Sequence, residues 1–201
     1  MINIYRTDNR IISEIDQFDT GAWVKLTAPT LEECAEISDR FHMDIADVRA
    51  ALDDEESSRI NLEDEYTLIL VDIPSAEMRN NRHSYTTIPL GILIAEDVVI
   101  TVCAEETAVL RSFVEQRVRD FSTKKQMRFT YQILYNACMV YQSLLRSIDR
   151  KRTEIEERID QNTEDVDLID LHELESNLVY FATSLRANGV VLDRLTRYGR
   201  L

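Results

Sequence analysis

The chain has 201 residues, of which 44% are hydrophobic and 30% charged, and its formal net charge is −14. A composition with only 4 glycines and 3 prolines favours helices joined by short connections and excludes a fibrous or disordered chain. The excess of acid excludes a nucleic-acid partner, because neutralising phosphates requires a basic face. The longest apolar stretch, 88–104, is interrupted by Glu96-Asp97, so no segment is predicted to span a membrane.

The first half of the chain, up to residue 104, alternates short apolar runs with polar connections, which predicts a sheet with helices packed on it. The first two runs, 2–6 and 10–15, flank Asp8-Asn9 and predict a β-hairpin. Further strands are predicted at 22–29, 66–74, 86–95 and 98–104. The run at 66–74 is apolar at nearly every position, which indicates a strand buried on both faces.

Two helices are predicted between the third and fourth strands. Thr30 and Glu33 have the spacing of a capping box, which predicts a helix that begins after Thr30 and ends near Phe41. A second, shorter helix is predicted over residues 44–52.

The second half of the chain carries two series of residues at alternating steps of three and four, most of them apolar. This seam is typical of paired helices, and its members are Tyr131, Leu134, Cys138, Tyr141, Leu145, Ile148, Arg152, Ile155 and Ile159, then Leu171, Leu174, Leu178, Phe181, Leu185, Asn188, Leu192 and Leu195. Between the series lies the polar link 160–167, in which Thr163 or Asp165 is predicted to cap the second helix. A short link between helices of similar length predicts an antiparallel pair. The chain therefore divides into an α/β part at 1–122 and a helical hairpin at 123–201.

Motifs for a chemical reaction are absent from the sequence. There is no phosphate-binding glycine motif, no zinc-protease motif and no nucleophile elbow. Cys34, Cys103 and Cys138 lie far apart, which predicts reduced thiols and argues against a zinc site. We therefore predict that the chain is not an enzyme.

The segment L-D-D-E-E-S-S-R at 52–59 holds four consecutive acidic residues, Asp53, Asp54, Glu55 and Glu56. Carboxylate oxygens are the ligands that hard divalent cations such as Mg²⁺ prefer, so this segment is a candidate cation site. A structural role is the alternative. In that interpretation, Asp53 bonds backbone amides at the end of the short helix, and Glu56 pairs with Arg59.

Three stretches, taken in order and followed by the long seam, resemble the amino-terminal cytoplasmic domain of the CorA family of magnesium and cobalt transporters. They are W-V-K-L-T-A-P-T-L-E-E at 23–33, L-D-D-E-E-S-S-R-I at 52–60 and V-V-I-T-V at 98–102. The resemblance implies an α/β/α sandwich with a mixed sheet (fold class α/β, α+β), followed by a long antiparallel helical hairpin. The stalk helix and the transmembrane helices of the family would lie after residue 201.

The same resemblance implies a function. Family members are homopentamers at the cell membrane, and this part of the chain would lie on the cytoplasmic face. Cytosolic Mg²⁺ bound between neighbouring soluble domains holds the pore closed, so the implied partners are divalent cations and further copies of the chain. The alternative that we retain is a soluble scaffold whose helical hairpin binds a partner helix.

The metal ligands of the family do not carry over directly. Counting from Phe41 places its acidic pair on Arg49 and Ala50, which cannot bind Mg²⁺ as carboxylates do. The nearest carboxylates are the candidate ligands of this chain, and they are Asp47, Asp53, Asp54 and Glu56.

Overall fold

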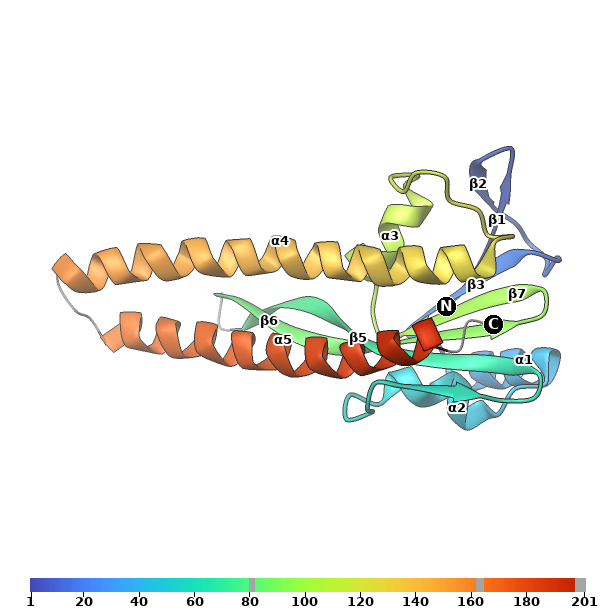
Figure 1. Cartoon of the computed structure of the whole chain (residues 1–201), viewed down its shortest axis with the longest axis horizontal. Helices are drawn as coiled ribbons and strands as arrows, with labels where there is room; N and C mark the ends of the chain where they lie inside the picture. Colours follow the sequence, from blue (N-terminus) through green and yellow to red (C-terminus); the bar gives the residue numbers. More distant parts are fainter. Residues whose placement is uncertain (80–81, 162–164, 198–201) are drawn as a thin grey trace.

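Seven strands form one mixed sheet in the computed structural model, which describes residues 1–79, 82–161 and 165–197 (Figure 1). The strands are β1 (Ile2–Asp8), β2 (Ile11–Glu14), β3 (Ala22–Thr27), β4 (Arg59–Leu62), β5 (Tyr66–Arg79), β6 (Arg82–Ala95) and β7 (Val98–Cys103). Their order in the sheet is β2-β1-β3-β7-β6-β5-β4. The central pair β3 and β7 is parallel, and the other neighbouring pairs are antiparallel.

Short helices cover one face of the sheet. They are α1 (Leu31–Phe41), α2 (Ile45–Arg49) and the 3₁₀ helix η1 (Ala50–Leu52). Cys34, Ile37 and Val48 from these helices pack on Val24 and Ile100 of the central strands, and all five side chains are buried.

The opposite face carries α3 (Ala108–Val114) and the two long helices α4 (Gln126–Gln161) and α5 (Asp165–Arg197). Successive strand residues point to opposite faces, so Trp23 packs under these helices whereas Val24 packs under α1 and α2. The predicted α/β/α sandwich with a mixed sheet is therefore confirmed. No helix among the residues that the structure describes is both long and apolar enough to cross a membrane.

An aromatic cluster joins α3 and α4 to the sheet. Phe129 of α4 lies 5.1 Å from Trp23, 5.1 Å from Phe113 and 4.7 Å from Phe121, measured between ring centroids. The indole N–H of Trp23 donates to Thr101 Oγ1 at 2.9 Å, so this buried polar group has a partner. The core therefore contains side chains from both sides of residue 122.

The short-range predictions are confirmed, with one shift. The predicted hairpin is present, but it turns at Asn9 and Arg10, one residue later than predicted, and the φ values of 50° and 68° are those of a tight hairpin turn. At the start of α1, the Glu33 N–H donates to Thr30 Oγ1 at 3.2 Å, and the Thr30 N–H donates to the Glu33 carboxylate at 2.8 Å. The predicted helix over 44–52 is present as α2 and η1.

Two elements were not predicted, and three others are longer than predicted. Strand β4 and helix α3 were not predicted, β5 and β6 each extend to 14 residues, and α4 begins at Gln126 instead of Tyr131. The long β5–β6 ribbon continues beyond the other strands and lies along α4 and α5 (Figure 1). In this region Phe181 of α5 packs between Tyr85 of β6 and Tyr141 of α4, with ring centroids 6.5 and 5.1 Å apart.

The ribbon also explains why the predicted seam is only partly buried. Residues at seven-residue spacing are buried, and they are Leu134, Tyr141, Ile148 and Ile155 on α4 with Leu174 and Phe181 on α5. Cys138 and Leu178, at the intervening positions, are exposed. The two helices share their apolar faces with the sheet, so they do not pack on each other alone. The predicted cap Thr163 lies outside the described residues.

Candidate functional site

The first candidate ligand, Asp47, lies on α2 and is held by a buried tyrosine. The Tyr66 hydroxyl donates to Asp47 Oδ2 at 2.7 Å and accepts from the Asp44 N–H at 3.2 Å. Asp44 itself caps α2, because its Oδ1 accepts from the Ala46 N–H at 2.8 Å. The Asp47 carboxylate therefore already has a structural partner, the Tyr66 hydroxyl.

Burial, and secondly the bond to Asp47, raises the pKa of Tyr66 from 10.0 to about 12. The folded-state pKa is then above the unfolded-state pKa. The stabilisation is complete below pH 10 and is lost as the pH rises towards the folded-state pKa of about 12. Between those values, an unfolded Tyr66 ionises whereas a folded one stays neutral.

We expect Tyr66→Phe to lose less stability than the unmodified chain when the pH is raised from 10 to 12. Asp47→Asn should have a smaller effect in the same direction, since it removes a charge that raises the pKa. Urea unfolding across this pH range measures both. Equal losses of stability in Tyr66→Phe and the unmodified chain would contradict the assignment.

The acidic segment after η1 forms a turn that leads into β4. Asp53 Oδ1 accepts from the Glu55 N–H at 3.0 Å, and the Glu56 carboxylate forms an ion pair with Arg59. Glu56 Oε1 also accepts from the Ser57 N–H at 3.1 Å. The structural interpretation of Asp53, Glu56 and Arg59 is therefore confirmed.

The four candidate ligands do not converge within one chain. Asp47 and Glu56 are half-buried and bonded to neighbours, whereas Asp53 and Asp54 are exposed. Across the described parts of the chain, no three His, Cys, Asp or Glu side chains are arranged to hold a metal ion. Among these four, the exposed carboxylates of Asp54 and of Asp53, whose Oδ1 also accepts from the Glu55 N–H, are the ones accessible to a cation together with groups from elsewhere.

The two positions to which the resemblance assigns an acidic pair, Arg49 and Ala50, differ in burial. Ala50 is only 6% exposed and packs in the core beneath α1 and α2, whereas Arg49 is exposed. A carboxylate at position 50 would be buried among apolar side chains, so the alanine agrees with its surroundings.

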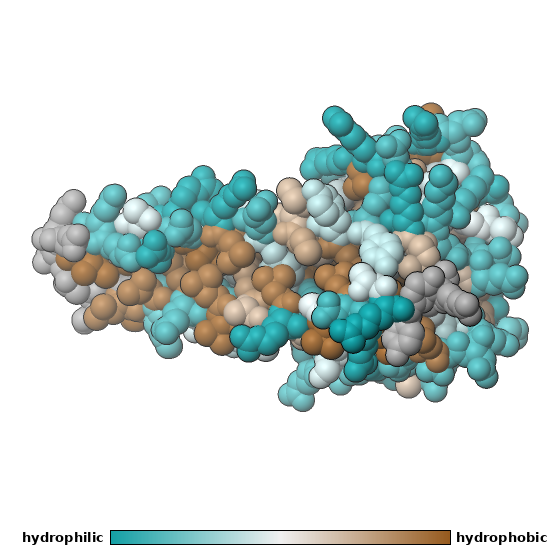
Figure 2. All heavy atoms as spheres, viewed as in Figure 1, coloured by the Kyte–Doolittle hydropathy of each residue, from teal (hydrophilic) through white to brown (hydrophobic). Residues whose placement is uncertain are grey.

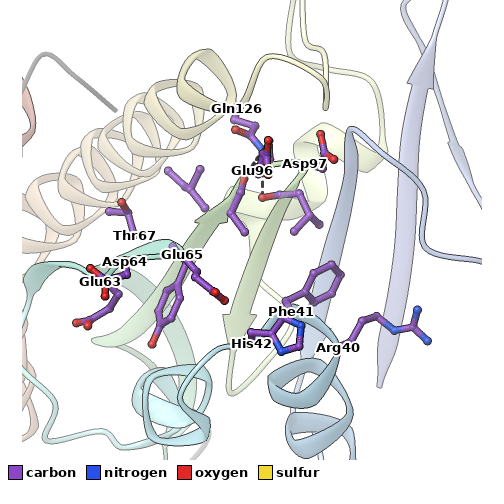
Figure 3. A pocket seen from close by; sticks show the side chains of 14 residues that line it. Arg40, Phe41, His42, Glu63, Asp64, Glu65, Thr67, Glu96, Asp97 and Gln126 are labelled. Atoms are coloured by element: carbon purple, nitrogen blue, oxygen red, sulfur yellow. Dashed lines mark hydrogen bonds between the residues drawn. The ribbon is translucent and has the colours of Figure 1, made fainter.

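An open acidic hollow of about 820 Å³ lies beside the β4–β5 and β6–β7 turns and the end of α1. Figure 3 shows Glu63, Asp64 and Glu65 on the β4–β5 turn near Glu96 and Asp97 on the β6–β7 turn, with the end of α1 opposite them. Gln126 Nε2 fixes the second turn, because it donates to the carbonyls of Ala95 and Glu96 at 2.7 and 3.2 Å. Arg40 and His42 are the basic residues that line it.

Sequence reasoning did not find this hollow. Its signal was present as two short acidic runs, 63–65 and 96–97, each placed between apolar strands. The runs meet only because β5, β6 and β7 are neighbours in the sheet. The carboxylates that line the hollow attract cations.

The fold of this chain is similar to the folds of several solved structures. It superposes on the soluble domain of CorA from Methanocaldococcus jannaschii with a TM-score of 0.82 and 22% identity, covering 96% of this chain and 77% of that one. The complete CorA magnesium transporter of the same organism gives a TM-score of 0.83 at 21% identity, covering 98% of this chain and 63% of that one. The cytoplasmic domain of ZntB from Vibrio parahaemolyticus gives a TM-score of 0.70 at 11% identity, covering 98% of this chain and 79% of that one. At these identities the likeness shows the fold alone.

Sequence comparison identifies the family. The family model described as CorA-like Mg2+ transporter protein matches residues 18–201, and the chain belongs to this family. A curated relative, the cobalt/magnesium transport protein CorA of Methanocaldococcus jannaschii, is 24% identical over 179 residues. The match covers 87% of this chain and 55% of the relative, so the chain spans about half the length of that protein.

Proposed function

We propose that this chain is the regulatory domain of a CorA-type divalent cation transporter, which senses Mg²⁺ and couples its binding to gating. The observation that carries the proposal is the family match over residues 18–201. The domain would lie on the cytoplasmic face of the membrane and would perform no catalysis. Mg²⁺ and Co²⁺ are the proposed cargo, and five copies would surround the pore.

The exposed carboxylates of Asp53 and Asp54 suit a Mg²⁺ ion shared between subunits. Mg²⁺ keeps most of its water and needs only one or two carboxylates from a protein. Acidic surfaces on neighbouring copies repel each other unless a divalent cation lies between them. Occupancy of such a site would therefore favour one arrangement of the subunits over another.

The exposed apolar residues of α4 and α5 support a larger assembly. Figure 2 shows hydrophobic residues gathered along the line between the two helices. The exposed large apolar side chains on them are Tyr131, Tyr135, Met139, Leu168, Ile169, Leu178, Val179, Tyr180 and Val190. A patch of this kind marks an interaction surface, and the stalk helix that the family places after this region would cover it.

We expect Mg²⁺ to promote association of the chain, because it relieves repulsion at the shared site. Sedimentation velocity in Mg²⁺ and in chelator measures this effect at matched ionic strength. The double variant Asp53→Asn, Asp54→Asn should sediment equally in Mg²⁺ and in chelator, because it removes the carboxylates that bind the ion and repel each other. Asparagine still accepts the bond from the Glu55 N–H, so the turn should survive.

The matched control is Glu36→Gln, Asp39→Asn, which removes the same charge from exposed residues of α1. It should keep the response to Mg²⁺. Sedimentation that is unchanged by Mg²⁺ in every variant would contradict the shared site and leave the family assignment intact.

A further inference from the structure

A separate hollow of about 270 Å³ lies where the β1–β2 hairpin meets the beginning of α4. Figure 1 shows these two parts at the end of the molecule opposite the tip of the helical pair. Its basic lining residues are Arg10, Lys124, Lys125 and Arg128, and Asp120 is the one acidic residue among its described lining. This local excess of positive charge runs against the net charge of −14 for the whole chain.

Buried hydrogen bonds join the two walls of the hollow. Thr7 and Thr123 are 4% and 0% exposed. The Thr7 N–H donates to Thr123 Oγ1 at 3.1 Å, and the Thr123 N–H donates to Thr7 Oγ1 at 2.9 Å. Ser122 Oγ accepts from the Thr7 hydroxyl at 3.3 Å. The basic groups are thus carried on walls that are already fixed to each other, which lowers the entropy lost on binding a ligand.

The basic side chains divide into paired and unpaired ones. Lys124 Nζ lies 2.9 Å from the Asp8 carboxylate, and the Arg128 guanidinium lies 3.9 Å from that of Asp120. Arg10 and Lys125 are exposed and have no carboxylate partner within the described part of the chain. Two cations beside one small hollow repel each other unless an anion lies between them.

We propose that this hollow binds an anion of the phosphate type, such as a phosphate or diphosphate group. The arginine fork suits phosphate oxygens, and α4 begins at Gln126, so the positive end of its helix dipole lies beside the hollow. A volume of about 270 Å³ accommodates one or two phosphate groups but not a complete nucleotide. Arg10 and Lys125 are the anion-binding residues, and Lys124 and Arg128 complete the positive field.

Isothermal titration with inorganic pyrophosphate, in metal-free buffer, tests the proposal. The double variant Arg10→Ala, Lys125→Ala should weaken binding at least about tenfold, since each change removes a charge-assisted bond. Neither side chain has an ion pair to lose, so the fold should survive, which circular dichroism verifies. Asp120→Asn should strengthen binding, because it removes the acidic lining residue and asparagine tolerates the φ of 53° at this position.

The control double variant Arg146→Ala, Arg150→Ala removes the same charge from exposed residues further along α4 and should leave the affinity unchanged. The proposal is overturned by the absence of pyrophosphate binding at millimolar concentration. It is also overturned if both double variants weaken binding equally.

A second arm distinguishes a free anion from a lipid headgroup. Phosphatidylcholine vesicles with and without phosphatidylinositol 4-phosphate are sedimented with the chain, in the presence and absence of pyrophosphate. Pyrophosphate binding without sedimentation identifies a free anion as the ligand, and sedimentation that pyrophosphate abolishes identifies a headgroup. Sedimentation in a chain that fails to bind pyrophosphate would overturn the hollow as the site.

Discussion

Replacing Phe129 with alanine is expected to lower the free energy of unfolding by about 3–5 kcal/mol. The Phe129 side chain is 0% exposed and contacts the rings of Trp23, Phe113 and Phe121. Its removal leaves a cavity at the centre of a close-packed aromatic cluster, and the rigid sheet beneath it cannot collapse to fill the space.

Urea unfolding measures this loss with two signals. Trp23 is the only tryptophan, so its fluorescence reports on the sheet, whereas far-ultraviolet circular dichroism reports mainly on α4 and α5. Tyr135→Ala is the matched control, because Tyr135 lies on the same helix and is 67% exposed. The control should change stability by no more than about 0.5 kcal/mol. A loss in Phe129→Ala as small as in the control would contradict the described packing.

The same experiment tests the predicted division into residues 1–122 and 123–201. Phe129 lies after that boundary, but its neighbours Trp23, Phe113 and Phe121 lie before it. A shared core of this kind predicts that both signals change at the same urea concentration. Two separate transitions would instead favour two independent domains.

Local signals explain which parts of the fold could be predicted from the sequence. The capping box at Thr30 and Glu33 and the β1–β2 hairpin depend on residues only a few positions apart, and both are present. Strand β4 was missed because R-I-N-L has four residues and one buried side chain, so its extended form depends on pairing with β5. Helix α3 is seven residues long and was missed for a similar reason, since its stability comes from burying Val109, Leu110 and Phe113.

The candidate site shows the same limit. The turn formed by Asp53, Glu56 and Arg59 was predictable from a spacing of three residues. The acidic hollow was not, because the runs 63–65 and 96–97 become neighbours only through the strand order. The seam of the long helices was predicted as a contact between them, but period alone does not reveal that the β5–β6 ribbon occupies part of that face.

Replacing Asn188 with leucine is expected to lower the free energy of unfolding by about 2–3 kcal/mol, although the side chains are similar in size. Strand β4 pairs with β5 as far as Leu70. The next backbone N–H and C=O groups on this edge of β5 are those of Asp72. Asn188 Oδ1 accepts from the Asp72 N–H at 2.9 Å, and Asn188 Nδ2 donates to the Asp72 carbonyl at 2.7 Å. The amide of one α5 side chain thus continues the edge pairing of the sheet, and leucine would leave both backbone groups without these partners.

A comparison with Tyr141→Phe resolves the contribution of the shared acceptor. The Tyr141 hydroxyl donates to the same Asp72 carbonyl at 3.0 Å, so this variant should lose about 1 kcal/mol. Because both side chains bond one oxygen, the effects of the double variant should not be additive. Val190→Ala, at a residue of α5 that is 54% exposed, is the matched control.

Hydrogen exchange of the Asp72 amide distinguishes lost bonding from general destabilisation. Exchange should accelerate at Asp72 in Asn188→Leu more than at Ile69, which is 0% exposed and pairs with β6. Equal acceleration at both amides would mean that the bonds do not hold the strand edge. A leucine variant as stable as the unmodified chain would mean that apolar packing alone fixes α5 on the sheet. A polar residue within an apolar seam usually specifies the register of the packed elements. Here Asn188 would specify the register of α5 against β5. That register determines how a movement of the long helices is transmitted to the sheet.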